Sequence, residues 1–226
     1  MKVTTDGCLF GAWVSRELEI ISRKPGTCNI LDIGTGTGLL AIMLAQANEA
    51  CIDAIEIDKE AFDQATKNAT ASPWADRIKI LHADVTKFEF PVLYDAIVCN
   101  PPFYENELKG NDAKKNIAHH NEGLLLPQLL TVIKKNLKPG GIFYLLLPYK
   151  RTEEIKKLFS ENGLAIQQLT FVRQSVNHNY FRVMLQGKLN PFEIIETMID
   201  ELSIKNDNDQ YTQTFISLLK NYYLNL

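Results

Sequence analysis

The chain contains 226 residues and carries a formal net charge of −3 at pH 7, with an isoelectric point near 5.8. Its length suits one large α/β domain, and its 46% hydrophobic and 23% charged residues are ordinary for a globular protein with a sizeable core. No apolar run approaches the ~20 residues of a membrane span and no signal-peptide pattern begins the chain, so we expect no membrane association and a cytoplasmic location. The four cysteines are widely spaced, and the sequence predicts neither a disulfide framework nor a metal site.

Strands and helices alternate along the first half of the chain, which indicates βαβ units and a parallel sheet. A helix is predicted over residues 7–22, capped by Asp6. A glycine loop joins the first strand to an apolar helix, and another helix follows the second strand. The predicted strands of this half are residues 29–33, 51–57, 78–81 and 94–99.

The second half continues the pattern. An apolar stripe with i, i+3, i+4, i+7 spacing predicts a helix over residues 126–137. The predicted strands are residues 142–147, 164–172 and 180–186, of which the last two form a terminal hairpin, and a helical stripe near the C-terminus is expected to dock on the domain. We expect one domain over residues 1–226, made of the N-terminal helix, a cofactor half (29–90), a substrate half (91–190) and a tail (191–226).

Polar side chains recur where the predicted strands end. Asp32, Glu56, Asp84 and Asn100 each fall at the carboxyl end of a strand. In a parallel sheet with right-handed crossovers these ends lie along one edge, where ligands bind. The sequence therefore places the functional site at this edge.

The loop after the first strand indicates a nucleotide-like cofactor. Gly34, Gly36 and Gly38 let the backbone approach a ligand and direct helix N–H groups at it. Their spacing differs from the Gly-x-Gly-x-x-Gly fingerprint, which disfavours a nicotinamide oxidoreductase, and no Lys-Ser/Thr pair follows, which excludes a P-loop. The carboxylates Asp32 and Glu56 would repel a pyrophosphate but match the ammonium, sulfonium and adenosine of S-adenosylmethionine.

The motif Asn100-Pro101-Pro102-Phe103 follows the fourth strand. Two consecutive prolines fix two φ angles and make the path rigid. The Asn100 amide oxygen and a neighbouring carbonyl could receive an NH₂ group, and Phe103 could stack on a flat ring, which suits a nucleobase. An ordinary Asn-Pro turn with a core phenylalanine is the alternative.

Both motifs resemble those of a known family. The stretch 32–38 resembles the first motif of class I S-adenosylmethionine-dependent methyltransferases, and the stretch 100–103 resembles the motif of amino-methyltransferases. Residues 1–13 and 209–224 resemble the two ends of the bacterial tRNA(Val) adenine-N6 methyltransferases. The resemblance implies a Rossmann-like α/β fold, with a mostly parallel seven-stranded sheet, helices on both faces and a terminal antiparallel hairpin.

The resemblance also implies residue roles. Asp32, Gly34, Gly36 and Gly38 would contact the methionine part of the cofactor. Glu56 would bind the ribose hydroxyls. Ile57 would pack on the adenine ring, and Asp84 would accept a hydrogen bond from its amine. At the substrate, Asn100 and Pro101 would accept the two hydrogens of the target amine while Phe103 stacks on the base.

The resemblance implies the anticodon loop of a tRNA as partner, S-adenosylmethionine as cofactor, no metal and no membrane; we expect a monomer. Lysines at 109–115 are the best candidates for RNA backbone contact. Alternatives are an rRNA guanine-N2 or protein glutamine methyltransferase, or a cofactor-binding module without catalysis. Family members usually carry a further segment ahead of the N-terminal signature, so we expect either a short start or a missing segment.

Overall fold

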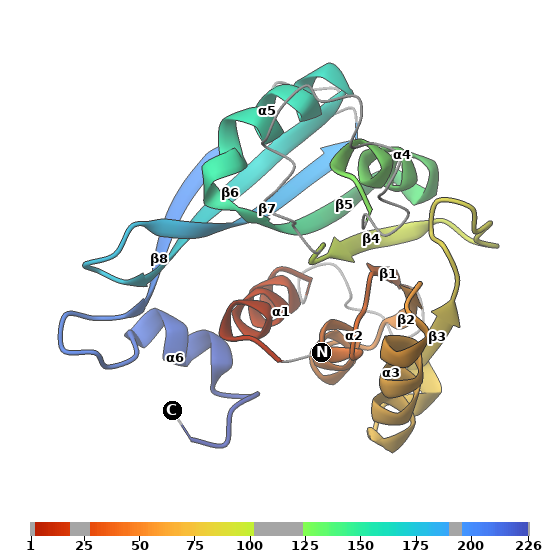
Figure 1. The fold of residues 1–226 in the computed structure, drawn as a ribbon, viewed down its shortest axis with the longest axis horizontal. Helices are drawn as coiled ribbons and strands as arrows, with labels where there is room; N and C mark the ends of the chain where they lie inside the picture. Colours follow the sequence, from red (N-terminus) through yellow and green to blue (C-terminus); the bar gives the residue numbers. More distant parts are fainter. Residues whose placement is uncertain (1–2, 19–27, 102–123, 190–195, 226) are drawn as a thin grey trace, which may run out of the picture.

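The structure is a computed structural model that describes residues 3–18, 28–101, 124–189 and 196–225 (Figure 1). Its strands form one sheet of order β3-β2-β1-β4-β5-β7-β6-β8. Every neighbouring pair is parallel except those made by β7, which runs antiparallel to β5 and β6. The strands are β1 (Asn29–Ile33), β2 (Cys51–Glu56), β3 (Ile78–His82), β4 (Tyr94–Cys99), β5 (Leu137–Pro148), β6 (Leu164–Ser175), β7 (Tyr180–Leu189) and β8 (Met198–Lys205).

The mostly parallel sheet and its terminal hairpin are confirmed, but the described residues form eight strands, where we predicted seven. The additional strand is β8, which lies in the stretch interpreted as a tail. Its first four residues are exposed, and only Leu202 and Ile204 are buried. The apolar alternation is therefore too short to predict a strand, and parallel pairing with β6 holds it in place.

Helices cover both faces of the sheet (Figure 1). One face carries α1 (Thr5–Leu18), α2 (Leu39–Ala47), α3 (Lys59–Ala71) and α6 (Gln213–Leu219), and the other carries α4 (Leu126–Asn136) and α5 (Thr152–Glu161). Successive strand residues alternate between the two hydrophobic layers, as the pleat requires: Ile30 belongs to the layer under α1 and α2, and Leu31 to the layer under α4. Two short 3₁₀ helices, η1 (Ala75–Arg77) and η3 (Tyr149–Arg151), join elements.

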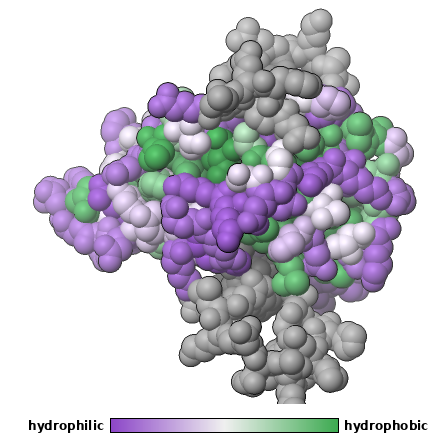
Figure 2. All heavy atoms as spheres, turned by 90° about the horizontal axis from the view of Figure 1, so that it is seen from above, coloured by the Kyte–Doolittle hydropathy of each residue, from purple (hydrophilic) through white to green (hydrophobic). Residues whose placement is uncertain are grey.

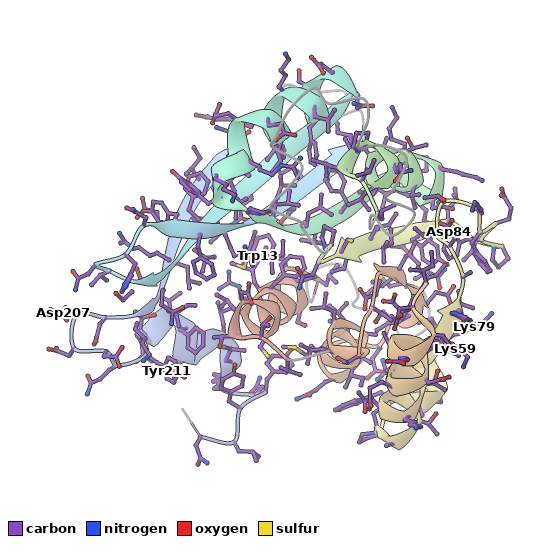
Figure 3. All side chains as sticks on the ribbon, in the orientation of Figure 1. Trp13, Lys59, Lys79, Asp84, Asp207 and Tyr211 are labelled. Carbon is purple, nitrogen blue, oxygen red and sulfur yellow. The ribbon has the colours of Figure 1, made fainter. Side chains whose placement is uncertain are left out.

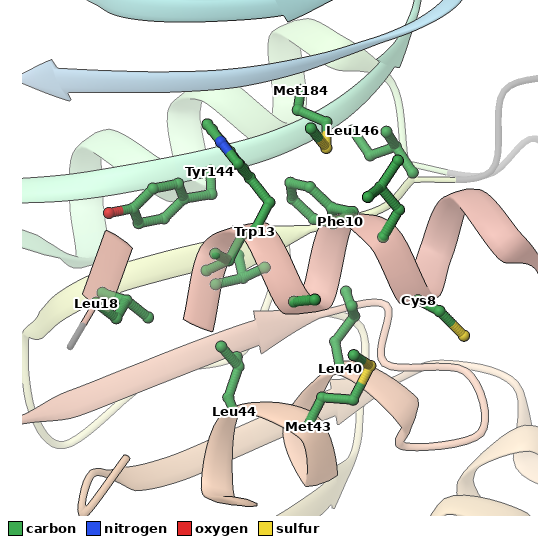
Figure 4. Packing of buried hydrophobic residues seen from close by; sticks show 14 of the residues in the cluster. Cys8, Phe10, Trp13, Leu18, Leu40, Met43, Leu44, Tyr144, Leu146 and Met184 are labelled. Atoms are coloured by element: carbon green, nitrogen blue, oxygen red, sulfur yellow. The ribbon is translucent and has the colours of Figure 1, made fainter. Parts of the chain in front are cut away.

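Helix α1 is enclosed between the sheet and α2 (Figure 4). Phe10 and Trp13 point toward the sheet, where Trp13 meets Tyr144 of β5 edge-on at 5.7 Å between ring centroids. Leu40 and Met43 of α2 approach from the opposite side. Because α1 is buried on most of its circumference, it is fixed to the rest of the fold, and its first turn is held in a set position.

The start of α1 corrects one expectation. The helix begins at Thr5, so Asp6 lies inside its first turn and does not cap it. Thr4 takes that role: its hydroxyl oxygen accepts from the Gly7 N–H at 3.3 Å, and its carbonyl accepts from Cys8 at 3.0 Å. The predicted residues 19–22 of this helix lie outside the described residues.

The C-terminal helix α6 docks against α1, as predicted. Phe215, Leu218 and Leu219 are buried in the hydrophobic layer that α1 and α2 share. The hydroxyl of Thr212 accepts from the Phe215 N–H and caps the helix. Docking therefore rests on three apolar side chains that share one face.

The surface mixes hydrophilic and hydrophobic residues. On the face shown in Figure 2, hydrophobic residues form separate patches between hydrophilic ones. None of the helices in the described ranges is both long enough and apolar enough to cross a membrane.

Gly187 gives a direct test of the packing between β7 and its neighbours. A Cβ at this position would lie 2.3 Å from the Phe143 ring and 2.8 Å from the Ala165 carbonyl oxygen. Because Phe143 is fully buried, it has no free space to move into. We expect Gly187→Ala to lower the free energy of unfolding by about 1–3 kcal/mol in urea titrations. In a double-mutant cycle with Phe143→Leu, which shortens the clashing side chain, part of this loss should be recovered; strict additivity would contradict the packing argument.

Candidate functional site

The glycine loop leaves β1 and turns sharply into α2. The Gly34 and Thr35 N–H groups donate to the Ile55 carbonyl oxygen of β2, at 2.9 and 3.1 Å, so the loop is tied to the neighbouring strand. Gly34, Gly36 and Gly38 all have positive φ, of 68°, 59° and 81°. These conformations are strained for other residues, which explains three glycines at this spacing.

The loop also leaves room for a ligand. A Cβ at Gly34 would meet no atom within 4 Å, so the backbone there borders open space. On the opposite side, a Cβ at Gly38 would meet the Ala65 backbone of α3 at 3.4 Å, and Asn68 of α3 donates to the Thr37 carbonyl at 2.8 Å. Helix α3 therefore braces the loop from one side and leaves the Gly34 side accessible.

Asp32 is fully buried beneath this loop. Its Oδ2 accepts from the Thr35 hydroxyl at 2.6 Å, whereas Oδ1 is buried without a hydrogen-bond partner of good geometry. Burial raises the pKa of the Asp32 carboxyl to about 7, against the lowering effects of the Thr35 hydroxyl and the Ala41 N–H, and the neighbouring Glu56 adds to the rise. A buried acceptor without a well-aligned donor is costly, so Asp32 is poised to receive a cationic or N–H donor group.

Glu56 ends β2 and is also buried. Its Oε2 accepts from the Gly36 N–H at 2.9 Å, and its Oε1 accepts from the Ile57 and Asp58 N–H groups, both at 2.9 Å. A carboxylate offers about four acceptor positions, so about one remains for a ligand. Glu56 thus holds the loop in shape, and any ligand hydroxyl must share its oxygens with the backbone.

Ile57 follows Glu56 directly and projects into solvent, with 65% of its surface exposed. An exposed isoleucine beside a buried carboxylate contributes nothing to the core. Ile57 is therefore not a core residue, and its exposure fits an apolar surface on which a flat ring could pack.

Asp84 lies beyond the tip of β3 (Figure 3). Its Oδ1 accepts from the Thr86 N–H at 2.9 Å and from the Thr86 hydroxyl at 2.6 Å, while Lys87 Nζ lies 3.1 Å from Oδ2. Hydrogen bonds from Thr86, aided by Lys87, lower the pKa of Asp84. In this arrangement the carboxylate stabilises its own turn, and only Oδ2 retains acceptor capacity for a ligand.

Asn100 follows β4 at the same edge as Asp32, Glu56 and Asp84. Its side chain makes no hydrogen bond within the part of the chain that the structure describes, which leaves its amide oxygen and NH₂ group available. Pro101 is buried next to it. Phe103 and the lysines at 109–115 lie outside the described residues.

The first turn of α1 borders Asn100, which sequence reasoning missed. A Cβ at Gly7 would lie 3.8 Å from Asn100 Nδ2, so the backbone of Gly7 forms one wall of the Asn100 site. Beside it, Asp6 pairs with Arg182 of β7, with Nε and Oδ2 2.8 Å apart. Burial opposes ionisation of Asp6, but hydrogen bonds from Thr4 and Arg182 outweigh it and lower its pKa. No local pattern could have found this contact, because it joins residues 176 positions apart.

Together these residues give the carboxyl edge of the sheet a defined chemistry. Asp32 and Glu56 lie on adjacent strands, and residues Thr35 and Gly36 of one loop donate to both carboxylates. The result is a site of negative potential bordered by open space at Gly34 and an apolar surface at Ile57, which fits a ligand that carries an ammonium group and a flat ring. Within the described ranges, no group of three or more His, Cys, Asp or Glu residues is arranged to hold a metal.

Comparisons with known proteins agree with this chemistry. The family profile of the methyltransferase small domain matches residues 18–171. A tRNA1(Val) (adenine(37)-N6)-methyltransferase of Phocaeicola vulgatus is 37% identical over 226 residues, which cover 100% of this chain and 92% of that protein. The protein of the same name from Dyadobacter fermentans is 39% identical over 229 residues, covering 99% and 91%.

Solved structures show the same fold. A predicted O-methyltransferase from Agrobacterium tumefaciens superposes with a TM-score of 0.69 at 16% identity, covering 97% of this chain and 99% of that one. Magnesium protoporphyrin IX methyltransferase from Synechocystis PCC 6803, solved with bound S-adenosylmethionine, superposes with a TM-score of 0.58 at 17% identity, covering 81% and 80%. At these identities the comparison concerns the class I methyltransferase fold alone.

The raised pKa of Asp32 predicts how stability depends on pH. The folded state holds this proton up to pH ~7, whereas an unfolded aspartate releases it near 3.9, so ionisation costs folding free energy. The contribution of Asp32 to stability should therefore fall as the pH rises from about 4 to about 7. Asp32→Asn, which cannot ionise, should gain stability relative to the wild type between pH 5 and pH 8 in urea titrations without ligand. A constant difference between the two proteins across this range would contradict the burial argument.

Proposed function

The chain belongs to the tRNA1(Val) (adenine(37)-N6)-methyltransferase family within the methyltransferase small-domain proteins, and on this premise we propose that it methylates the N6 amine of an adenine in a tRNA anticodon loop. The observation that carries the proposal is the position of Asn100. It follows β4 at the edge that also holds Asp32 and Glu56, so a cofactor group and a substrate amine can meet there. A tRNA substrate would place the enzyme in the cytoplasm.

The cofactor roles follow from the contacts described above. The ammonium of S-adenosylmethionine fits the buried acceptor Oδ1 of Asp32, and its methionine part fits the open space at Gly34. Glu56 has capacity for about one ribose hydroxyl in addition to its three backbone donors. Ile57 offers an apolar surface to the adenine ring. Asp84 is the weakest of these assignments, because its carboxylate already bonds Thr86 and Lys87.

The mechanism depends on how the chain holds the target amine. The Asn100 side-chain oxygen and the Pro101 carbonyl accept its two hydrogens, which draws the nitrogen lone pair out of the ring and directs it toward the cofactor side of the edge. When bound, S-adenosylmethionine would supply a methyl group whose bond to the positively charged sulfur breaks, with the electron pair remaining on sulfur. The amine that takes the methyl would become acidic, so its proton would pass to water without a strong general base. Catalysis is then mainly positioning and electrostatic stabilisation.

Two other methyltransferase substrates share the same chemistry at the amine. A guanine N2 and a protein glutamine amide both present an NH₂ group to an Asn-Pro-Pro motif, and a module without catalysis would bind the cofactor alone. The relatives that match over the whole chain are named for tRNA adenine, which favours that substrate.

Identification of the methylated nucleoside tests the proposed function. The protein is incubated with labelled S-adenosylmethionine and unmodified bulk tRNA, and the tRNA is then digested to nucleosides. Label in N6-methyladenosine is the expected result. Absence of label from tRNA adenine would overturn the proposal. Parallel incubations with unmodified rRNA and with protein acceptors then distinguish N2-methylguanosine, methylated glutamine and cofactor binding without any transfer.

Asn100 substitutions test the role of the amide. Asn100→Ala removes one acceptor for the amine, and the loss of at least one buried hydrogen bond should lower kcat by roughly five- to 150-fold or more. Asn100→Asp retains an acceptor oxygen and should retain more activity than Asn100→Ala. Cofactor affinity, measured by calorimetry, should be close to that of the wild type in both variants. Full turnover by Asn100→Ala would rule out this mechanism.

A further inference from the structure

Three aromatic rings meet at the carboxyl edge of the sheet, next to the end of β5. The centroid of the Tyr149 ring lies 5.1 Å from that of Phe171 and 5.1 Å from that of Tyr180, and the Phe171 and Tyr180 centroids are 5.6 Å apart. All three side chains are only partly buried. By contrast, the core pair Phe143 and Phe159 is completely enclosed. Tyr149, Phe171 and Tyr180 are termed the edge aromatic cluster below.

The cluster lies on the same edge as Asn100. β4, β5 and β6 all run toward this edge, and β7 begins there, so that Pro148 pairs with Arg182 and Arg173 with Tyr180. The path from Asn100 to the cluster crosses β5 and β7, a separation of two to three strand spacings or roughly 10–15 Å. A few unpaired nucleotides can span this distance. In the sheet order, β5, β7 and β6 lie on one side of β4 and β1 lies on the other, so the cluster and the cofactor loop flank Asn100 on opposite sides.

One arginine flanks the cluster: the Arg173 guanidinium lies 5.4 Å from the centroid of the Tyr180 ring. The Arg182 guanidinium lies 5.5 Å from the centroid of Phe181, which is outside the cluster. Guanidinium groups at aromatic faces can stack with bases and pair with phosphates. Arg182 pairs with the first turn of α1, and Phe181 packs on the hydrophobic layer that α1 shares, whereas Phe171 packs on the layer under α4 and α5. Arg173 is therefore the arginine that belongs to the cluster.

A purely structural role accounts for part of this arrangement. Glu201 of β8 accepts a hydrogen bond from the Tyr180 hydroxyl, which raises the pKa of Tyr180, and it lies 3.8 Å from Arg173. These contacts join the hairpin to β8, and they give the Tyr180 hydroxyl and the Arg173 guanidinium a structural role. They do not explain why Tyr149 and Phe171 also leave part of their rings exposed at this edge. Partly exposed rings beside cations are the features with which proteins bind unpaired nucleotides.

We propose that the edge aromatic cluster and Arg173 form a stacking platform for the unpaired nucleotides that flank the methylated adenine. This inference rests on the proposed function, because it identifies the surface that receives the RNA at that site. Anticodon-loop bases are unpaired and present flat faces, so stacking on Tyr149, Phe171 and Tyr180 requires little disruption of RNA structure. Arg173 then contacts a phosphate of the same strand.

The test measures RNA binding and turnover separately. A fluorescently labelled, unmodified anticodon stem-loop is titrated with the full-length wild type and variants at several salt concentrations, and KM and kcat are determined with tRNA. Tyr180→Ala should weaken RNA binding and raise KM by about tenfold, while kcat and cofactor affinity change little. Tyr180→Phe loses only the bond to Glu201 and keeps the ring, so it should bind RNA within about twofold of the wild type.

The charge of Arg173 has its own control. Arg173→Ala should weaken binding and reduce the slope of log affinity against log salt by roughly 0.7, the value for one contact with single-stranded nucleic acid. Lys135 is an exposed cation paired with Glu89 at the end of α4, toward the opposite edge of the sheet, and Lys135→Ala should leave both quantities unchanged. Melting temperatures of all variants identify any loss of folding.

The outcomes separate the platform from the proposed function. If the wild type binds and methylates the RNA and Tyr180→Ala does so equally well, the platform is wrong and the function stands. Equal losses in Tyr180→Ala and Tyr180→Phe would assign Tyr180 a structural role and also overturn the platform. If the wild type binds the RNA without methylating it, the proposed function fails, and the binding of the variants still decides the platform. Absence of RNA binding by the wild type would overturn both.

Discussion

Hydrogen bonds from one short loop to two carboxylates on neighbouring strands determine the geometry of the candidate site. Thr35 donates to Asp32 and Gly36 donates to Glu56, so the loop after β1 cannot shift without breaking both contacts. Positive φ at three glycines allows the sharp path that these bonds require. The arrangement leaves one buried oxygen of Asp32 without a hydrogen bond of good geometry, a cost that a bound cation would reduce. The free protein is thus less stable because of the same carboxyl group that is available to bind a ligand.

The substrate side of the edge depends on a second, longer-range constraint. Helix α1 is enclosed by the sheet and α2, and its first turn places Gly7 against Asn100. The Asp6–Arg182 pair links that turn to β7, the strand on which Tyr180 also lies. The first turn of α1, the proposed catalytic residue Asn100 and the hairpin of β6 and β7 therefore meet at one place. We infer that the position of Asn100 is sensitive to residues of both α1 and β7.

Local pattern predicted most of the sheet and the edge at which Asp32, Glu56 and Asn100 come together, because alternating strands and helices place strand ends together. It could not predict β8, whose pairing with β6 is a tertiary contact, or that Thr4 caps α1 while Asp6 pairs with the distant Arg182. Asp84 shows a further limit: the sequence places it at a strand end but does not reveal that its carboxylate bonds Thr86. The role of Phe103 remains a prediction, since it lies outside the described residues.

Proton release on cofactor binding tests most directly the claim that a buried, partly protonated carboxyl receives the ammonium group. Calorimetric titration with S-adenosylmethionine at pH 6, repeated in buffers of different ionisation enthalpy, measures the number of protons exchanged. Because the pKa of Asp32 is raised to about 7 in the free protein, binding of a cation beside it should release close to one proton per site. Asp32→Asn should release none. Binding without proton release in the wild type would contradict the account of how this edge recognises its ligand.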